Sequence, residues 1–326
     1  MRVIWIALLG VGLLAGSAAG ASKGGSVALV AYSTPKDAYG QIISAFQKTS
    51  AGSGSNFSQS YGASGDQARA VAAGLKADVV ALSLDPDINL LVGKGLVPKN
   101  WDANAHKGIV SDSVVVFVVR NGNPKHIKGW GDLVKPGVQV ITPNPFTSGG
   151  ARWNVMAAYG AQRKAGNTDK QAIAYLYKFF KHVPVQPDSA RTALQVFAQG
   201  KGDALITYEN EAIYAEKKGV HTEYKTPKST LLIETPVALT DSGLKNPAAK
   251  AFYKYLWSST AQKAFAAQGY RPVVKSAAGG RHFYKPPGLF TINTAKLGLN
   301  GWTKVNTRFF HPTKGIVAKI EKSLGQ

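Results

Sequence analysis

Cysteine is absent from this chain of 326 residues. Without cysteine there are no disulfide bonds, no thiolate nucleophile and no Cys-based metal site. Acidic residues are also scarce, because 18 Asp and Glu stand against 39 Lys and Arg, which gives a formal net charge of +21. With 44% hydrophobic residues, the sequence predicts a globular protein that is stabilised by burial and is long enough for two cores.

The positive charge is not concentrated in one segment. Lys and Arg are spread along the chain without a block of five or six like charges and without a recognisable nucleic-acid-binding motif. The sequence therefore predicts a solvated basic surface and no nucleic-acid partner. Attraction of diffusing anions and an acidic environment around the protein are both compatible with such a surface.

Motifs for metal, hydrolytic and nucleotide chemistry are missing. The histidines show no metal-ligand spacing such as His-x-x-x-His, and no Gly-x-Ser-x-Gly elbow supports a hydrolase. No Gly-rich turn ends in the Gly-Lys-Ser/Thr of a nucleotide-binding loop. We therefore expect no metal and no cofactor. The six histidines, most of them expected at the surface, are His106, His126, His182, His221, His282 and His311.

The N-terminus has the pattern of an export signal. Arg2 supplies a positive start, residues 3–16 are apolar, and residues 19–21 are small. The apolar run is shorter than the roughly 20 residues that span a bilayer, and no cysteine follows it to carry a lipid. Residues 1–21 are therefore predicted to be a signal peptide that is cleaved before Ser22, leaving a soluble exported protein.

Residues 141–154 (ITPNPFTSGGARWN) predict a strand end, a turn and a helix start. Ser148 can cap that helix, and Gly149 and Gly150 have no Cβ to keep a ligand away from the backbone N–H groups. A helix start with unpaired N–H donors is an anion site, here for a small anion without a nucleoside. The alternative is a plain turn and cap, because Ser and Gly cap many helices that bind nothing.

Strands alternate with helices along the first part of the chain. A strand is expected over residues 26–32, a helix over 36–48, a second helix over 67–75 and an apolar strand over 78–82. This alternation predicts parallel α/β units. The continuous apolar strand 114–119 predicts a sheet that is covered on both faces.

Two further segments place polar residues next to a predicted helix or strand. Residues 59–71 (QSYGASGDQARAV) form a second Gly/Ser turn before an apolar-periodic helix, and residues 204–212 (ALITYENEA) look like a buried strand with a polar end. Together with residues 138–154, they resemble the periplasmic sulfate-binding proteins of bacterial ABC transporters. Several segments recur in the family's order and approximate spacing, from about Val27 to near the C-terminus. The similarity also includes residues 269–272 (GYRP) and 289–292 (LFTI).

The resemblance implies an α/β fold of the type II periplasmic-binding-protein class, with a ligand cleft between two lobes and two chain crossings as a hinge. It implies a periplasmic monomer that captures sulfate or thiosulfate, delivers it to a membrane ABC permease and performs no chemistry. The alternatives are a receptor for another tetrahedral oxyanion, such as phosphate or molybdate, or, less favoured, a secreted enzyme on a sulfated or phosphorylated substrate.

The expected crossings between the lobes are residues 114–119 and residues 234–239. The expected units are the signal peptide (1–21), the first part of lobe 1 (22–115), lobe 2 (116–235), the second part of lobe 1 (236–285) and a C-terminal tail packing across the lobes (286–326).

The resemblance also implies a ligand site made of uncharged donors. A fully ionised tetrahedral dianion only accepts hydrogen bonds, so backbone N–H groups and a few side-chain donors satisfy it, whereas a nearby carboxylate repels it. Carried over from the family, the ligand-binding residues are Ser33, Ser64, Ser148, Gly149, Gly150, Ala190 and Tyr208.

Two of these positions depart from the family pattern. Ser33 stands where the family has Asp, and Tyr208 stands where it has Trp. A phenol donates one hydrogen bond as an indole does, but its oxygen also accepts. The choice of oxyanion therefore stays open.

Ser64 is expected to turn its hydroxyl to the ligand while its backbone starts a helix. With Gln67 it also has the spacing of a capping box, which is a purely structural alternative. Asp66 is interpreted as a first-turn acid that favours the helix dipole, with an acceptor for a protonated oxyanion as the alternative.

The remaining charged residues near these loops are expected to bond to the loops or to each other without contacting the ligand. Arg152 and Arg191 each follow a presumed ligand loop and are expected to bond loop carbonyls and polarise the donating peptides, with direct pairing with the anion as the alternative. Glu209 and Glu211 look like a catalytic pair, but we expect them to bind the hinge side or to pair with nearby Lys and Arg, since two carboxylates beside a dianion would repel it.

Overall fold

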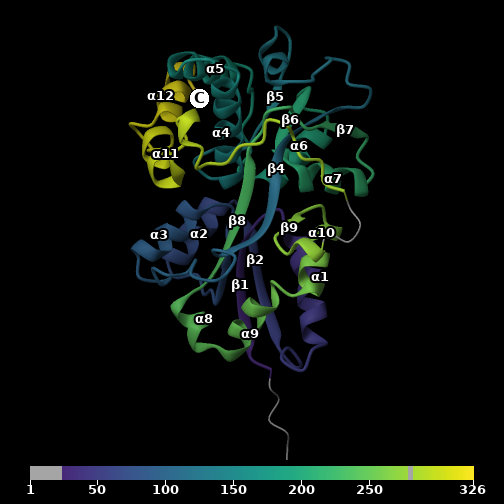
Figure 1. Ribbon diagram of the computed structural model, residues 1–326, viewed down its shortest axis with the longest axis vertical. Helices are drawn as coiled ribbons and strands as arrows, with labels where there is room; N and C mark the ends of the chain where they lie inside the picture. Colours follow the sequence, from purple (N-terminus) through teal and green to yellow (C-terminus); the bar gives the residue numbers. More distant parts are fainter. Residues whose placement is uncertain (1–23, 278–281) are drawn as a thin grey trace, which may run out of the picture.

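The computed structural model describes residues 24–277 and 282–326, and it has two α/β lobes stacked along the long axis (Figure 1). The expected signal peptide, residues 1–21, lies outside the described residues. The strands are β1 (Ser26–Tyr32), β2 (Asn56–Gly62), β3 (Val79–Ala81), β4 (Ile109–Arg120), β5 (Val140–Ile141), β6 (Ala204–Tyr208), β7 (Thr222–Lys225), β8 (Leu232–Leu239) and β9 (Arg271–Pro272).

The helices divide between the two lobes (Figure 1). Those of lobe 1, drawn below, are α1 (Lys36–Gln47), α2 (Ser64–Ala72), α3 (Asp85–Gly93), α8 (Asp241–Lys245), α9 (Pro247–Tyr255) and α10 (Ser259–Ala267). Those of lobe 2 are α4 (Gly149–Lys164), α5 (Asp169–Lys181), α6 (Ala190–Ala198), α7 (Glu209–Lys217), α11 (Gly301–Phe309) and α12 (Ile316–Leu324).

One path of strands runs through both lobes in the order β2-β1-β3-β8-β4-β6-β5, with β7 and β9 pairing along β4. The β1 strand is parallel to β2 and β3, and β5 is parallel to β6. These are the parallel units that the alternating pattern predicts. The β8 strand is antiparallel to both β3 and β4.

The two long strands β4 and β8 connect the lobes. Residues 109–114 of β4 pair with β8, whereas residues 115–119 pair with β6 of lobe 2. In β8, residues 237–239 pair with β3 of lobe 1. Both crossings expected from the sequence fall within these strands.

Apolar side chains of β1 alternate between two cores of lobe 1. Val27 and Leu29 pack with α1 and α9, whereas Val30 packs with α2 and α3 on the other face. This is why consecutive residues of the strand are apolar. The α1 helix turns Ile42 and Phe46 to the same core, as its periodicity predicts.

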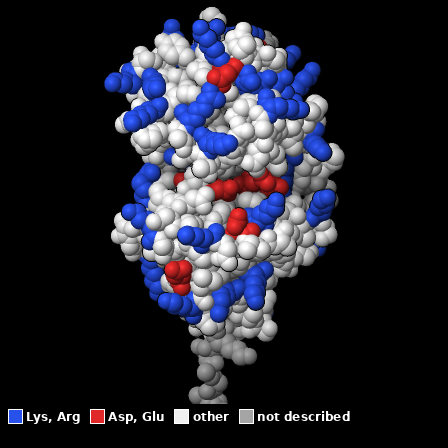
Figure 2. Space-filling view, turned by 60° about the vertical axis from the view of Figure 1, so that its left-hand side comes forward, with Lys and Arg blue, Asp and Glu red and all other residues white. Residues whose placement is uncertain are grey.

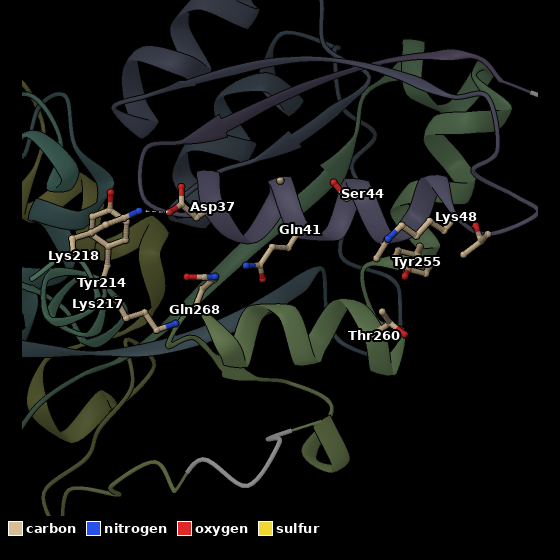
Figure 3. Close-up of a pocket in the computed structure, with 13 residues that line it drawn as sticks. Asp37, Gln41, Ser44, Lys48, Tyr214, Lys217, Lys218, Tyr255, Thr260 and Gln268 are labelled. Atoms are coloured by element: carbon tan, nitrogen blue, oxygen red, sulfur yellow. Dashed lines mark ion pairs between the residues drawn. The ribbon is translucent and has the colours of Figure 1, made fainter.

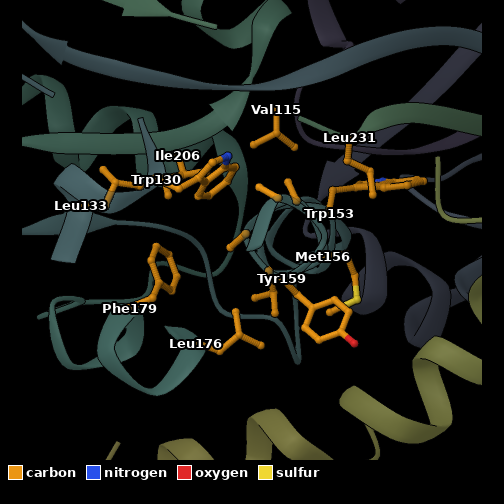
Figure 4. Packing of buried hydrophobic residues seen from close by; sticks show 14 of the residues in the cluster. Val115, Trp130, Leu133, Trp153, Met156, Tyr159, Leu176, Phe179, Ile206 and Leu231 are labelled. Atoms are coloured by element: carbon orange, nitrogen blue, oxygen red, sulfur yellow. The ribbon is translucent and has the colours of Figure 1, made fainter. Parts of the chain in front are cut away.

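Lobe 2 has a large aromatic core around α4 (Figure 4). Trp153, Met156 and Tyr159 of α4 lie in it with Trp130 and Phe179. The C-terminal helices complete this core.

The C-terminal helix α11 joins the lobe 2 core and also touches lobe 1. Trp302 stacks edge-on against Trp153 at 4.6 Å between ring centroids, and Phe309 packs on Tyr159 at 4.9 Å. The same helix contacts α3 of lobe 1.

Two helix starts differ from the sequence prediction. The α2 helix begins at Ser64, three residues before the expected start at Gln67. Residues 204–212 divide into a strand that ends at Tyr208 and a helix that begins at Glu209. Acidic residues in a first helical turn favour the helix dipole, which accounts for the change of structure at that point.

Within residues 24–277 and 282–326, no helix has the length and apolar character needed to cross a membrane. The same residues contain no cluster of three or more His, Cys, Asp or Glu that could hold a metal ion.

Candidate functional site

The starts of three helices and the end of β1 meet between the lobes. Ser64 begins α2 in lobe 1, and Gly149 and Ala190 begin α4 and α6 in lobe 2. Ser33 follows β1 and is half-buried. The Gly65 amide bonds the Thr147 carbonyl just before α4, and the Thr147 hydroxyl bonds the Asp188 carbonyl just before α6, so the three helix starts are neighbours. Positive helix ends provide a favourable electrostatic environment for an anion.

Ser148 caps α4, as expected, because its hydroxyl accepts a hydrogen bond from the Ala151 amide at 3.3 Å. Ser189 caps α6 in the same way through the Thr192 amide, at 3.2 Å. The first N–H groups of a helix have no acceptor within the helix. Within the described part of the chain, the amides of Gly149, Gly150 and Ala190 form no hydrogen bond, so they are available as donors.

Gly149 and Gly150 lie against groups from other segments. A Cβ on Gly149 would lie 2.6 Å from the Ser83 Oγ, and a Cβ on Gly150 would lie 2.8 Å from a ring carbon of Tyr208. Neither position has room for a side chain. The absence of a Cβ is therefore a packing requirement as well as a means of exposing the amides.

The Ser64 hydroxyl has a different partner from the one that either sequence interpretation gives. It donates to Asp87 Oδ2 at 2.5 Å and accepts from the Ser83 amide at 2.8 Å. The capping box is absent, because the N-cap is Ala63 with no side-chain bond, and Gln67 instead accepts from Ser60. The hydroxyl of Ser64 is thus directed at α3, which leaves its backbone N–H for a ligand.

Asp87 is a buried carboxyl next to these helix starts. Burial raises its pKa, while Arg152 and the hydrogen bond from Ser64 act in the opposite direction. The bond from Ser64 satisfies one oxygen of a charge that would otherwise be costly to bury.

Tyr208 reaches across from lobe 2 to lobe 1. Its hydroxyl lies 2.6 Å from the Ser83 Oγ, in the loop between β3 and α3. Trp153 of α4 donates from Nε1 to the Ser83 carbonyl at 2.9 Å. Burial raises the pKa of Tyr208 well above its ordinary value, so the phenol stays protonated and can donate.

The main chain also joins the lobes at this place. The Gly65 amide of α2 donates to the Thr147 carbonyl at 2.9 Å, just before α4 begins. Arg69 adds a bond to the neighbouring carbonyl of Phe146 at 3.3 Å, and it pairs with Asp66. Bonds of this kind hold the two lobes in a closed arrangement.

The two arginines near the site bond to loop carbonyls. Arg152 donates to the Pro145 carbonyl at 2.8 Å and to Asn306 of α11 at 2.9 Å. Arg191 forms two 2.8 Å bonds to Glu211 and one 3.0 Å bond to the Thr34 carbonyl of lobe 1.

The two glutamates at the start of α7 are buried and paired. Glu211 pairs with Arg191, and Glu209 forms bonds of 2.7 and 3.0 Å with Arg271. The expectation that these carboxylates pair with basic neighbours is confirmed.

Charge at the surface is distributed unevenly. Lys and Arg side chains are scattered over both lobes, and Asp and Glu side chains gather in a band between them (Figure 2). On the face drawn in Figure 2, basic side chains thus lie on both lobes, on either side of the acidic band.

A groove of about 950 Å³ lies between α1 and α10 of lobe 1 and α7 of lobe 2 (Figure 3). An ion pair of 3.8 Å between Lys218 and Asp37 crosses it. Asp37, Tyr214 and Gln268 also line a small cavity of about 10 Å³ that reaches Arg191. The groove thus extends toward the Arg191 side of the site.

Sequence reasoning missed Ser83 and Asp87. Ser83 follows the apolar strand β3 directly, which is the pattern that singled out Ser33 after β1. The carboxyl ends of parallel strands meet at one edge of a sheet, so this position was a usable signal. Asp87 gave no signal, since an acid in a first helical turn is common.

Comparison with known proteins identifies the family. The family model described as bacterial extracellular solute-binding protein matches residues 27–271. The sulfate-binding protein of Synechococcus elongatus is 41% identical over 302 residues, which cover 89% of this chain and 86% of that protein. The thiosulfate-binding protein of Pseudomonas aeruginosa is 37% identical, over 83% of this chain and 85% of that protein.

A solved structure shows the same fold. The sulfate-binding protein SubI from Mycobacterium tuberculosis H37Rv is similar with a TM-score of 0.83 and 44% identity, over 88% of this chain and 99% of that chain. A periplasmic thiamin-binding protein shares the fold at 18% identity and a TM-score of 0.66. The chain therefore belongs to the bacterial extracellular solute-binding proteins and, among them, to the sulfate-binding protein family.

Proposed function

We propose that this protein captures sulfate or thiosulfate in the closed cleft between its lobes and delivers it to a membrane ABC permease. The observation that carries the proposal is that the amides of Gly149, Gly150 and Ala190 are unpaired at two helix starts that neighbour the start of α2. Relatives named sulfate-binding and thiosulfate-binding proteins support the choice of ligand.

A fully ionised oxyanion fits donors of this kind. Sulfate only accepts hydrogen bonds, and backbone amides donate without bringing a counter-charge into the cleft. Among the carboxyls nearest the helix starts, Glu211 is paired with Arg191, and Asp87 accepts from Ser64. These bonds give both carboxyls partners within the protein.

The proposed contacts are the backbone amides of Ser33, Ser64, Gly149, Gly150 and Ala190, together with Ser148 and Tyr208. The hydroxyl of Tyr208 is the side-chain donor of this set that faces the first turn of α4, because a Cβ on Gly150 would lie 3.1 Å from it. Ser148 contributes chiefly by capping α4.

The same proposal places the protein in the periplasm as a monomer, after removal of residues 1–21. It also assigns the protein binding and release without catalysis. Relatives that are named as binding proteins support this role.

Calorimetric titration tests the proposal. Protein stripped of ligand by unfolding and refolding is titrated with sulfate, thiosulfate, hydrogen phosphate and molybdate. We expect one-to-one binding of sulfate or thiosulfate and rejection of hydrogen phosphate by several orders of magnitude, because a buried O–H without an acceptor costs about 1–3 kcal/mol and a mismatched shell adds to this. Equal affinity for phosphate would overturn the assignment.

A further inference from the structure

A chain of buried hydroxyls crosses from lobe 1 to lobe 2. It begins at Asp87, which accepts from Ser64 at 2.5 Å, and it continues through the 2.8 Å bond from the Ser83 amide to Ser64. It ends with the 2.6 Å contact between the hydroxyls of Ser83 and Tyr208. Ser64, Ser83 and Tyr208 are at most 2% exposed, so water does not compete for these bonds.

The two serines differ in how their hydroxyl protons are used within this series of hydrogen bonds. A hydroxyl has one proton to donate, and Ser64 donates its proton to Asp87. Ser83 and Tyr208 share one hydrogen bond, which uses one of their two protons. The other proton is left for a different acceptor.

The two hydroxyl oxygens of this pair lie beside the first turn of α4. The positions of missing side chains show this, because a Cβ on Gly149 would lie 2.6 Å from the Ser83 Oγ and a Cβ on Gly150 would lie 3.1 Å from the Tyr208 hydroxyl. The unpaired amides of the same two glycines are the proposed anion donors.

Ser83 is also held in place from both lobes. Its amide is bonded to Ser64 of lobe 1, and its carbonyl accepts from Trp153 Nε1 of lobe 2 at 2.9 Å. Its hydroxyl therefore has a defined direction when the lobes are closed.

We propose that Ser83 is a positioning residue of the ligand site. Its hydroxyl holds that of Tyr208, so that the pair donates one hydrogen bond to the bound oxyanion and holds the lobes closed. Ser64 contributes its backbone, while its hydroxyl positions Asp87. This inference rests on the proposed function, and it adds to that function a residue and a side-chain donor pair.

The experiment is a double-mutant cycle on release of sulfate. Ser83→Ala, Tyr208→Phe and the double variant are loaded with sulfate, and dissociation is followed by stopped-flow tryptophan fluorescence. Each single variant should raise the dissociation rate about tenfold, which corresponds to the loss of one hydrogen bond to a charged ligand. The double variant should release sulfate about as fast as either single variant, because a hydroxyl that has lost its partner also loses the fixed direction in which it donates to the ligand.

Ser55→Ala is the matched control. Its hydroxyl is equally buried and donates to the Gly52 carbonyl at 2.6 Å, in the loop between α1 and β2. We expect this variant to release sulfate at the wild-type rate. Unfolding of the ligand-free proteins in urea is measured in parallel, because a purely structural role of Ser83 would lower the midpoint without coupling to Tyr208.

Wild-type release by Ser83→Ala, or effects of the two variants that multiply in the double variant, would overturn the inference and leave the proposed function intact. Failure of the wild-type protein to bind sulfate in the titration would overturn the proposed function and the inference together.

Discussion

The guanidinium of Arg191 in lobe 2 donates to the carbonyl of Thr34 in lobe 1 at 3.0 Å. The same side chain is held by two bonds to Glu211, and it lies 3.7 Å from the ring centroid of Tyr214. Its position is thus set within lobe 2 before the lobes meet. One side chain therefore links a buried ion pair to closure of the cleft.

Removing this guanidinium should destabilise the protein. In Arg191→Met, the Glu211 carboxylate, whose side chain is 0% exposed, loses its partner, so we expect the free energy of unfolding to fall by about 3–5 kcal/mol. Urea denaturation of the ligand-free protein measures this. The double variant Arg191→Met with Glu211→Met should recover most of the loss. A single variant as stable as the wild type would contradict the prediction.

Ser64→Ala should affect stability through Asp87. The change removes the donor to a buried carboxyl, which costs about 1–3 kcal/mol of unfolding free energy. Adding Asp87→Asn should restore part of this loss, because a neutral amide is less costly to leave unpaired. Thermal and urea unfolding measure both. If Ser64→Ala instead lost sulfate affinity at full stability, its hydroxyl would be a ligand donor.

A methyl group at Gly150 should displace the Tyr208 ring and weaken its contact with Ser83 of lobe 1. In Gly150→Ala, the new Cβ would lie 2.8 Å from a buried ring carbon of Tyr208, so the ring must move. We expect sulfate affinity to fall more than tenfold, a loss above about 1.4 kcal/mol. Calorimetry measures the affinity. Gly40→Ala on α1, where a Cβ meets nothing within 4 Å, is the control and should bind as the wild type does.

These contacts show how far the sequence could predict the site. Ser148 was predictable as a cap, because a Ser-Gly-Gly turn before a helix is a local pattern. The direction of the Ser64 hydroxyl was not predictable, since it depends on Asp87, which lies 23 residues away on α3. Ser83 meets Tyr208 over 125 residues of sequence, and only the closed lobes bring the two together.

The α/β units of the fold were also predictable from local patterns in the sequence. Continuous apolar strands and amphipathic helices are local patterns, so the α/β units were predictable. The start of α7 was missed, because residues 209–211 look like the polar end of the preceding strand, whereas the two acids among them are buried by pairing with distant arginines.

Added salt should change the association rate of sulfate and not its dissociation rate. The scattered Lys and Arg act through solvent, and exposed charges more than about 8 Å apart are screened at physiological ionic strength. Raising sodium chloride should therefore slow sulfate association and leave the dissociation rate almost unchanged. Stopped-flow measurements over a salt series test this. A steep rise in dissociation with salt would mean that exposed cations hold the anion.

A partly buried carboxyl on β4, one of the two strands that connect the lobes, should make the stability of the protein depend on pH. Asp112 of β4 lies opposite Glu234 of β8. Burial, followed by the charge of Glu234, raises the pKa of Asp112 to about 7. Because this pKa is above that of the unfolded chain, about 3.9, the stability that Asp112 contributes is complete below pH 4 and is lost as the pH rises through 7.

Asp112→Asn removes this titration. Its unfolding free energy relative to the wild type should increase between pH 5 and pH 8, by roughly 1–2 kcal/mol after allowance for partial exposure. Urea unfolding at both pH values measures the change. A difference that stays constant with pH would show that the carboxyl does not titrate in this range.

The shared strand β4 has a consequence for how the protein unfolds. The strand supplies a neighbour to β8 with its first half and to β6 with its second, so neither sheet is complete without it. A lobe that lost its structure alone would leave strand edges unpaired in the other. The two lobes should therefore melt in one cooperative transition, although each has its own hydrophobic core.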